Sequence, residues 1–349
     1  MSEVKNIISK LLSLKINCCL VNHDNSRIVS IHMKLLVLFL FLPCMFFGQH
    51  TLREVEGFLD KKQYSEAEAA IMTYVKENPN DLKGIELLGD TYGQQKKWDE
   101  AIEQYKKLVE LSPKTANYHY KYGGAMGMKA LKVNKLKALG MIGDIKSSFL
   151  KAAELDPNHI DTRWALVELY IQLPGIVGGS ISKALDYAKE LEKLSKVDGY
   201  LAKGYVYEYD EEPGLAEKYY KMAIKEGGSM TCYEKLTHFY ETQKQPEKAI
   251  ANLQEHQEVH KRNALHYQIG KVAAEYNVEL AKGEQCLNIY IKNYSAEDGV
   301  PLEWAYYRLA QVYKNKGDKS QALKYINKAI AGLPDIEPFK EEKSQILSL

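Results

Sequence analysis

The stretch LKGIELLGDTYGQQKKWDEAIEQYKKLVELSP, residues 82–113, decides the fold of this chain of 349 residues. Its apolar residues recur every three or four positions in two segments, which is the period of an amphipathic helix. A polar break around Gln95 to Trp98 separates the segments, and Pro113 ends the second one because proline cannot continue a helix. The stretch therefore predicts two helices joined by a short turn.

The spacing within residues 82–113 recurs along the rest of the chain. In each copy a residue of the first helix is followed twelve positions later by a small residue of the second helix, and four positions after that by a larger one. The small residue lets the two helices approach closely, and the larger one is expected to fill the space between neighbouring helix pairs. The copies are Val55/Ala67/Ile71, Gly89/Ala101/Tyr105, Gly204/Ala216/Tyr220, Thr237/Ala249/Leu253, Gly270/Gly283/Leu287 (one residue longer) and Ala310/Ala322/Ile326.

The motif L-G-x-x-Y from Leu88, followed by A-x-x-x-Y from Ala101 and a closing proline, resembles the tetratricopeptide repeat. The resemblance covers Thr51 to the C-terminus. It implies an all-α fold, an α-solenoid that forms a right-handed superhelix of about eight helix-turn-helix repeats. Residues 50–334 are assigned to the repeat array, and residues 335–349 to a capping helix with a polar outer face.

Three segments are longer than the repeat requires, near residues 123–142, 173–180 and 291–301. The first is expected to extend the two helices around it. The second, L-P-G-I-V-G-G-S, is either an enlarged turn or a ligand site, because functional residues concentrate in unusual loops. It is not a phosphate-binding loop, since no G-K-[ST] follows its first glycine. With the D-P-N-H that precedes it, this segment is similar to a group of bacterial repeat proteins.

Residues 33–49 have the layout of a secretory signal peptide. A Met and a Lys precede an uncharged apolar run at residues 35–47, which is shorter than the length that crosses a bilayer as a helix. We expect cleavage near Gly48 or Gln49, export to the periplasm or beyond, and no membrane span in the mature chain. Residues 1–32 are interpreted as a mis-assigned upstream extension, because a signal peptide begins at the start of a protein.

Composition and chemical motifs exclude several classes of function. Lys and Arg total 47 against 46 Asp and Glu without a dense basic run, which argues against nucleic acid as a partner. Beyond residue 49 only Cys232 and Cys286 remain, and two isolated thiols form no disulfide framework. No G-x-S-x-G or C-x-x-C motif is present. The sequence therefore predicts neither an enzyme nor a cofactor.

His256 and His260 have the spacing of two zinc ligands on one helix face, and His266 is a candidate third ligand. A metalloprotease needs a glutamate directly after the first histidine, and Gln257 stands there. His256 also falls at an inward-facing position of the repeat. We therefore expect core packing at His256 rather than a metal site.

In tetratricopeptide arrays the first helices line a concave groove that holds a protein or peptide, and this role is carried over by the resemblance. Tyr267 and Tyr307 are expected to be exposed there, and the groove to suit a peptide of some acidic character. The Lys and Asn of the family's carboxylate clamp have no counterpart in this chain. The groove positions carried over by frame are Asn117, Tyr120, Tyr205, Glu208, Glu234, His238, Tyr267, Lys271, Trp304, Tyr307, Gln311 and Lys314.

These observations predict a non-catalytic binding or assembly scaffold of a bacterial cell envelope, with a protein or peptide as its partner. Two alternatives stay open. One is an exported enzyme or small-ligand protein that uses the glycine-rich insertions. The other is a structural protein that associates with itself.

Overall fold

The computed structural model describes residues 51–349, and every structural statement below concerns that range. These residues form α-helices and two short 3₁₀ helices, with no β-strand among them. The described residues divide into two compact units, with the boundary between Pro113 and Lys114. The all-α repeat fold predicted from the sequence is confirmed, whereas the assignments of residues 1–32 and 33–49 lie outside the described residues.

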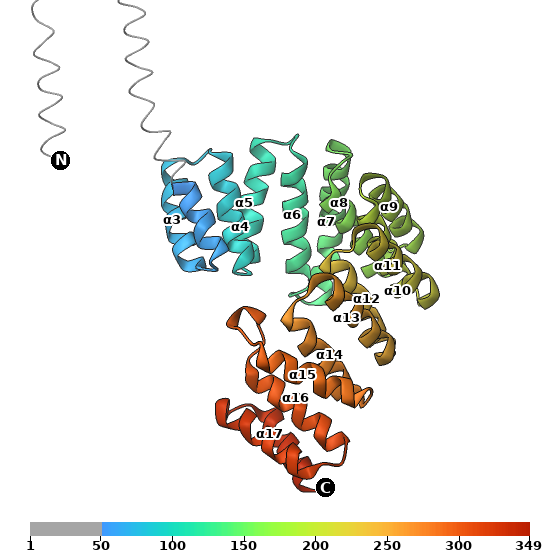
Figure 1. Ribbon diagram of the computed structural model, residues 1–349. Helices are drawn as coiled ribbons and strands as arrows, with labels where there is room; N and C mark the ends of the chain where they lie inside the picture. The colour runs from blue at the N-terminus through green and yellow to red at the C-terminus, as the bar shows by residue number, and fades with distance from the viewer. Residues whose placement is uncertain (1–50) are drawn as a thin grey trace, which may run out of the picture. The chain divides into compact units, whose positions relative to one another are not determined.

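The first unit contains two helix pairs, drawn in blue and cyan in Figure 1. The deciding stretch at residues 82–113 folds as predicted into two helices with a turn between them. Asp81 caps the first of these, since its carboxylate accepts a hydrogen bond of 2.9 Å from the backbone N–H of Gly84. The helices are residues 51–60, α3 (Tyr64–Glu77), α4 (Leu82–Gln94) and α5 (Trp98–Leu111).

The second unit continues the alternation of first and second helices (Figure 1). The first helices are α6 (Ala116–Ala130), α8 (Ile160–Gln172), α10 (Lys196–Tyr209), α12 (Met230–Thr242), α14 (Asn263–Tyr276) and α16 (Leu302–Asn315). The second helices are α7 (Lys135–Leu155), α9 (Ile181–Leu194), α11 (Pro213–Gly227), α13 (Pro246–His260), α15 (Leu280–Lys292) and α17 (Lys319–Gly332). The last helix is α18 (Glu337–Leu347), and the 3₁₀ helices are η1 (Gly175–Val177) and η2 (Ala296–Asp298).

The small residues of the first helices are required by close packing. A Cβ atom added to Gly204 would lie 2.6 Å from the ring of Tyr220, and one added to Gly270 would lie 2.3 Å from Leu287. Real Cβ atoms do not approach other atoms so closely. The larger residue of a second helix therefore packs against the first helix of its own pair, whereas the sequence analysis placed it between pairs.

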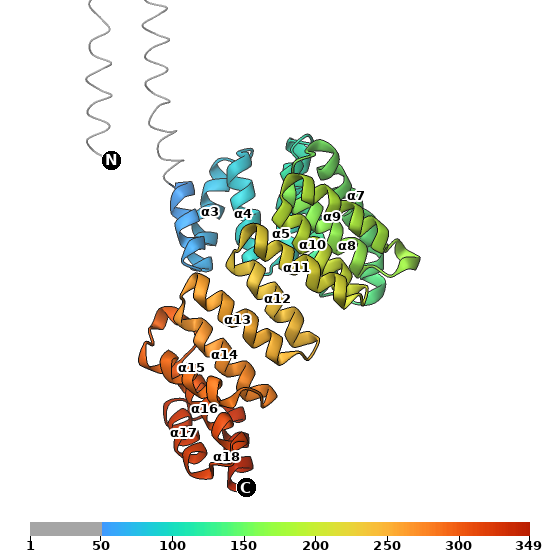
Figure 2. The same cartoon turned by 45° about the vertical axis from the view of Figure 1, so that its right-hand side comes forward.

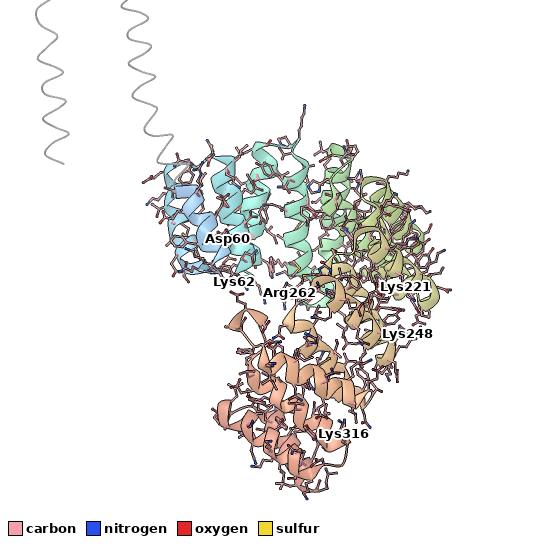
Figure 3. All side chains as sticks on the ribbon, viewed as in Figure 1. Asp60, Lys62, Lys221, Lys248, Arg262 and Lys316 are labelled. Atoms are coloured by element: carbon pink, nitrogen blue, oxygen red, sulfur yellow. The ribbon has the colours of Figure 1, made fainter. Side chains whose placement is uncertain are left out.

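Neighbouring helix pairs are joined through carboxylates that directly follow the small residue of a second helix. Glu217 on α11 accepts hydrogen bonds from Lys221 (2.7 Å), Lys248 (3.0 Å) and Tyr240 (3.0 Å), and the last two belong to the next pair. Lys221 and Lys248 are labelled in Figure 3. Burial raises the pKa of Glu217, but these hydrogen bonds outweigh it and bring the pKa down to about 2. Glu284 on α15 accepts from Tyr313 in the same way.

Two of the insertions follow first helices, and one follows a second helix. The segment near residues 123–142 includes the end of α6 and the start of α7, which has 21 residues. The segment at residues 173–180 contains η1, and the segment at residues 291–301 contains η2. Within the described residues no helix is both long and apolar enough to cross a membrane.

His256 on α13 is fully buried, and neither of its ring nitrogens has a hydrogen-bond partner. Its ring stacks on Tyr233 at 4.8 Å and meets His260 edge-on at 4.9 Å. Burial lowers the pKa of His256 to about 4, with smaller contributions from His260 and from Arg262. The position is part of the core, as the sequence predicts. No group of three metal-ligating side chains lies together anywhere in residues 51–349.

We expect the buried His256 to make the protein sensitive to mild acid. An unfolded chain takes up a proton at the ordinary pKa of 6.5, whereas the folded chain does so only near 4. Acidification from pH 7 towards pH 4 therefore favours the unfolded state, and the loss of unfolding free energy should approach about 3 kcal/mol.

Urea unfolding at several pH values measures this loss. His256→Phe keeps a buried ring and should reduce the loss of unfolding free energy between pH 6.5 and pH 4.5, above the range in which Glu217 and other hydrogen-bonded carboxylates take up protons. His238→Phe replaces an exposed histidine and should leave it unchanged. Equal acid sensitivity in the wild type and both variants would contradict the assignment of this sensitivity to His256.

Candidate protein-binding surface

The first helices of the second unit lie next to one another, so residues at the same position of successive repeats form rows. Helices α6, α8, α10 and α12 pack in this order, as do α14, α16 and α18. Figure 2 shows α10, α12, α14 and α16 following one another in this way. The two series are connected by an ion pair between Lys271 on α14 and Glu241 on α12, at 3.7 Å.

The predicted residues on α6, α10 and α12 are at least partly accessible. Glu234 and His238 are exposed, and Tyr120, Tyr205 and Glu208 are half-buried, as is Asn117. The Tyr205 hydroxyl accepts a hydrogen bond from Gln172 at 3.3 Å. Glu208 accepts hydrogen bonds from Tyr220 (2.7 Å) and Thr242 (3.3 Å), which hold its carboxylate between neighbouring helix pairs.

Tyr267 and Tyr307 are core residues. Tyr267 is 5% exposed, and its ring centre lies 5.4 Å from that of Tyr290 on the second helix of its own pair. Tyr307 is 9% exposed and stacks on Phe339 of α18 at 5.0 Å. Trp304 is partly buried against the same Phe339. The expectation that Tyr267 and Tyr307 are exposed contact residues is wrong, because each ring fills the space between two helices.

The two predicted lysines are both compensated by carboxylates. Lys271 lies between Glu241 (3.7 Å) and Glu275 (3.8 Å), and Glu275 also pairs with Arg308 at 2.6 Å. The side chains of these residues are between 11% and 32% exposed, so they form a partly buried ladder across α12, α14 and α16.

The ladder continues onto α18. Lys314 pairs with Glu342 at 2.6 Å, and Gln311 donates a hydrogen bond to the same carboxylate at 3.1 Å. Glu342 is only 5% exposed. The sequence predicts a peptide of some acidic character as the partner, but carboxylates neutralise Lys271 and Lys314, the lysines that would attract it. Lys271 and Lys314 therefore join neighbouring helices and are not free to bind an acidic peptide.

Two exposed carboxylates on α8 were missed by the sequence analysis. Asp161 and Glu168 occupy the same rows as the predicted residues, and neither forms an ion pair within the described residues. The insertion at residues 173–180 displaces the repeat frame, so α8 received no prediction. If the repeat positions are counted from buried Val167 in α8 instead of from Ala184 in α9, Asp161 and Glu168 fall at groove positions.

Glu168 lies near two of the half-buried tyrosines. Burial raises the pKa of Tyr120 on α6, and the charges of Asp161 and Glu168 raise it further. Burial also raises the pKa of Tyr205 on α10, with Glu168 again contributing. We call Asp161, Glu168 and Glu234 the acidic strip. The strip runs over α8 to α12, and aromatic rings flank it.

Two hollows lie elsewhere, each over a first helix between consecutive second helices. One, of about 810 Å³, is formed by α3, α4 and α5 in the first unit. The other, of about 590 Å³, is formed by α11, α12 and α13 in the second unit, with Leu236 and Tyr240 in its floor. Neither is lined by a residue of the insertions, so neither supports a small-ligand site there.

Two segments of the chain match known family models. Residues 89–129 match a model described as TPR repeat, and residues 305–331 match one described as tetratricopeptide repeat. These matches support the resemblance seen in the sequence. Among curated proteins, the Tetratricopeptide repeat protein 30 homolog of Drosophila melanogaster is 27% identical over 95 residues, which are 27% of this chain and 14% of that protein.

Solved structures of low sequence identity are also similar. A thermophilic TPR protein from Thermus thermophilus is 17% identical with a TM-score of 0.47, over 56% of this chain and 97% of that one. A tetratricopeptide repeat protein from Parabacteroides merdae is 14% identical with a TM-score of 0.46, over 86% of this chain and 98% of that one.

Because Tyr267 and Tyr307 are buried, replacing either by alanine should destabilise the fold. Loss of a buried aromatic ring costs about 3–5 kcal/mol, so the double variant Tyr267→Ala/Tyr307→Ala should melt far below the wild type or fail to fold. The matched variant Glu234→Ala/His238→Ala changes two exposed residues and should melt within a few degrees of the wild type. Circular dichroism during heating measures both, and an unchanged melting curve for the tyrosine variant would contradict the burial.

Proposed function

We propose that this chain is a non-catalytic scaffold that holds a segment of another protein on the first helices α6 to α12. The observation that carries the proposal is the acidic strip, whose three carboxylates are exposed and form no ion pair within the described residues. Glu241 and Glu275 on the first helices α12 and α14, and Glu342 on α18, are paired with cations. Unpaired charges on a rigid surface are available to a partner.

The chemistry of the strip favours a partner segment with lysine or arginine residues. Opposite charges accelerate association and fix the register of a complex. Tyr120 and Tyr205 supply rigid, half-buried rings beside the strip, and such rings are good contact residues for apolar or guanidinium groups. The basic segment replaces the acidic peptide inferred from the sequence, because the lysines behind that inference are compensated by carboxylates.

Export to a bacterial cell envelope is part of the proposal and rests on the sequence of residues 33–49 alone. The matched family models support a repeat scaffold, and a repeat array presents its first helices as one extended surface. A scaffold of this kind needs no catalytic group, which agrees with the absence of nucleophile and metal motifs from the sequence.

Charge reversal on the acidic strip should weaken capture of the partner without unfolding the scaffold. Glu168→Lys/Glu234→Lys replaces attraction by repulsion at two exposed sites, and we expect capture to fall by about tenfold or more. The measurement is an affinity capture from the envelope fraction of the source cell, with residues 50–349 as bait and captured proteins quantified by mass spectrometry.

The control variant makes the same change of net charge away from the strip. Glu258→Lys/Glu297→Lys reverses two exposed carboxylates, one on the second helix α13 and one on η2. It should capture the partner as the wild type does, and both variants should keep the wild-type melting temperature within a few degrees. Equal capture by the two variants would contradict the proposed binding site.

A further inference from the structure

The junction of α6 and α7 carries an unusual combination of charge and apolar surface. We call residues 127–143, GMKALKVNKLKALGMIG, the tip segment. It contains four lysines and no acidic residue, although the whole chain is close to neutral at a formal charge of +1. The segment consists of the end of α6, a turn at residues 131–134 and the start of α7. The side chain of Asn134 caps α7 by accepting a hydrogen bond of 3.0 Å from the backbone N–H of Lys137.

Three leucines of the tip segment are exposed to solvent. Leu136 is 83% exposed, Leu131 is 77% exposed and Leu139 is 47% exposed. Single exposed leucines are ordinary on protein surfaces, but several within nine residues form a patch that marks an interaction site. The glycines Gly127, Gly140 and Gly143 have open space where a Cβ atom would lie, so close packing does not explain them.

Three lysines of the tip segment are available for binding. Lys132, Lys135 and Lys137 are exposed, and none of them forms an ion pair within residues 51–349. They lie between or next to the exposed leucines in the sequence. The tip segment therefore presents cations and apolar side chains together.

The second insertion extends the same edge of the molecule. Because α6 and α8 are neighbouring first helices, the turns that follow them lie on the same side of the array. The loop lies against α7, since a Cβ atom on Gly178 would lie 3.4 Å from the Nζ atom of Lys146. Ile176, at the centre of η1, is 96% exposed.

The loop that carries Ile176 is closed by a tight backbone approach and a hydrogen bond. A Cβ atom on Gly179 would lie 1.7 Å from the carbonyl oxygen of Leu173, so only glycine fits there. The backbone N–H of Ser180 closes the loop with a hydrogen bond of 2.8 Å to the carbonyl of Tyr170. Lys146 and Lys183 lie over the Tyr170 ring at 5.4 Å and 5.5 Å, which adds positive charge to this edge.

We propose that this edge, formed by the tip segment and Ile176, docks on the surface of an anionic lipid membrane. Leucine and isoleucine side chains that protrude from a turn can enter the boundary between headgroups and acyl chains. Lysines beside them reach the phosphate groups, and their long stems let the ammonium stay in the headgroup layer. A protein partner would need a concave acidic surface to cover a protrusion of this kind, whereas a lipid interface adapts to it. The proposal is independent of the acidic strip.

Co-sedimentation of the full chain with lipid vesicles tests the proposal. The chain should bind vesicles of phosphatidylglycerol and phosphatidylcholine, bind pure phosphatidylcholine vesicles much more weakly, and lose affinity as salt is added. Lys132→Ser/Lys135→Ser/Lys137→Ser should lower the affinity by about fivefold per lysine at low salt. Leu131→Ser/Leu136→Ser should lower it by about tenfold or more.

Matched controls separate the tip segment from general charge and from the apolar residues 35–47, which all variants share. Lys225→Ser/Lys292→Ser/Lys324→Ser removes three exposed lysines from other helices, and Leu347→Ser/Leu349→Ser removes two exposed leucines from the C-terminus. Both controls should bind vesicles as the wild type does. Circular dichroism verifies that every variant is folded.

Two results would overturn the proposal. One is equal vesicle binding by the tip variants and their controls. The other is capture of an envelope protein that depends on the tip segment while vesicle binding does not, which would assign the edge to an acidic protein partner.

Discussion

The structure depends on the contact between one residue near the middle of each first helix and the residue that faces it on the second helix. Where the second helix carries Tyr220, the first helix has Gly204, and a single added Cβ atom would lie 2.6 Å from the ring. In α8 and α9 the sizes are reversed, because the same two frame positions hold Val167 and Ala188, both fully buried. Pairing a small residue with a larger one in this way keeps the two helices at a constant separation, so successive helix pairs can stack in register.

Much of the fold could be predicted from this contact, because its residues recur at fixed spacing. The helix pair at residues 82–113 and the burial of His256 both follow from the repeat frame. The repeat spacing does not show which residue of another helix contacts a given position. Tyr267 and Tyr307 occupy positions that line a surface in the family, yet their rings fill the space beside Tyr290 and Phe339. Pairing across helices depends on residues about thirty positions away, such as Glu342 for Gln311, and spacing within one repeat does not reveal them.

The functional surface was predicted only in part, for two physical reasons. The cations Lys271 and Lys314 looked available in the sequence, but neighbouring carboxylates compensate them. Asp161 and Glu168 were overlooked because the glycine-rich loop before α9 shifts the count of positions. Once both corrections are made, the exposed carboxylates without an ion pair at the groove positions of α6 to α12 are those of the acidic strip. The insertion that hid part of this strip also carries Ile176 to the edge proposed to meet the membrane.

The central claim is that a partner binds the first helices α6 to α12. Amide hydrogen exchange of the chain, alone and in complex with the protein it captures, tests this most directly, because a bound segment stabilises the helices that it contacts. The account predicts slower exchange in α8, α10 and α12 on binding, with the second helices α13, α15 and α17 unchanged. Protection confined to the second helices, or to α16 and α18, would contradict it.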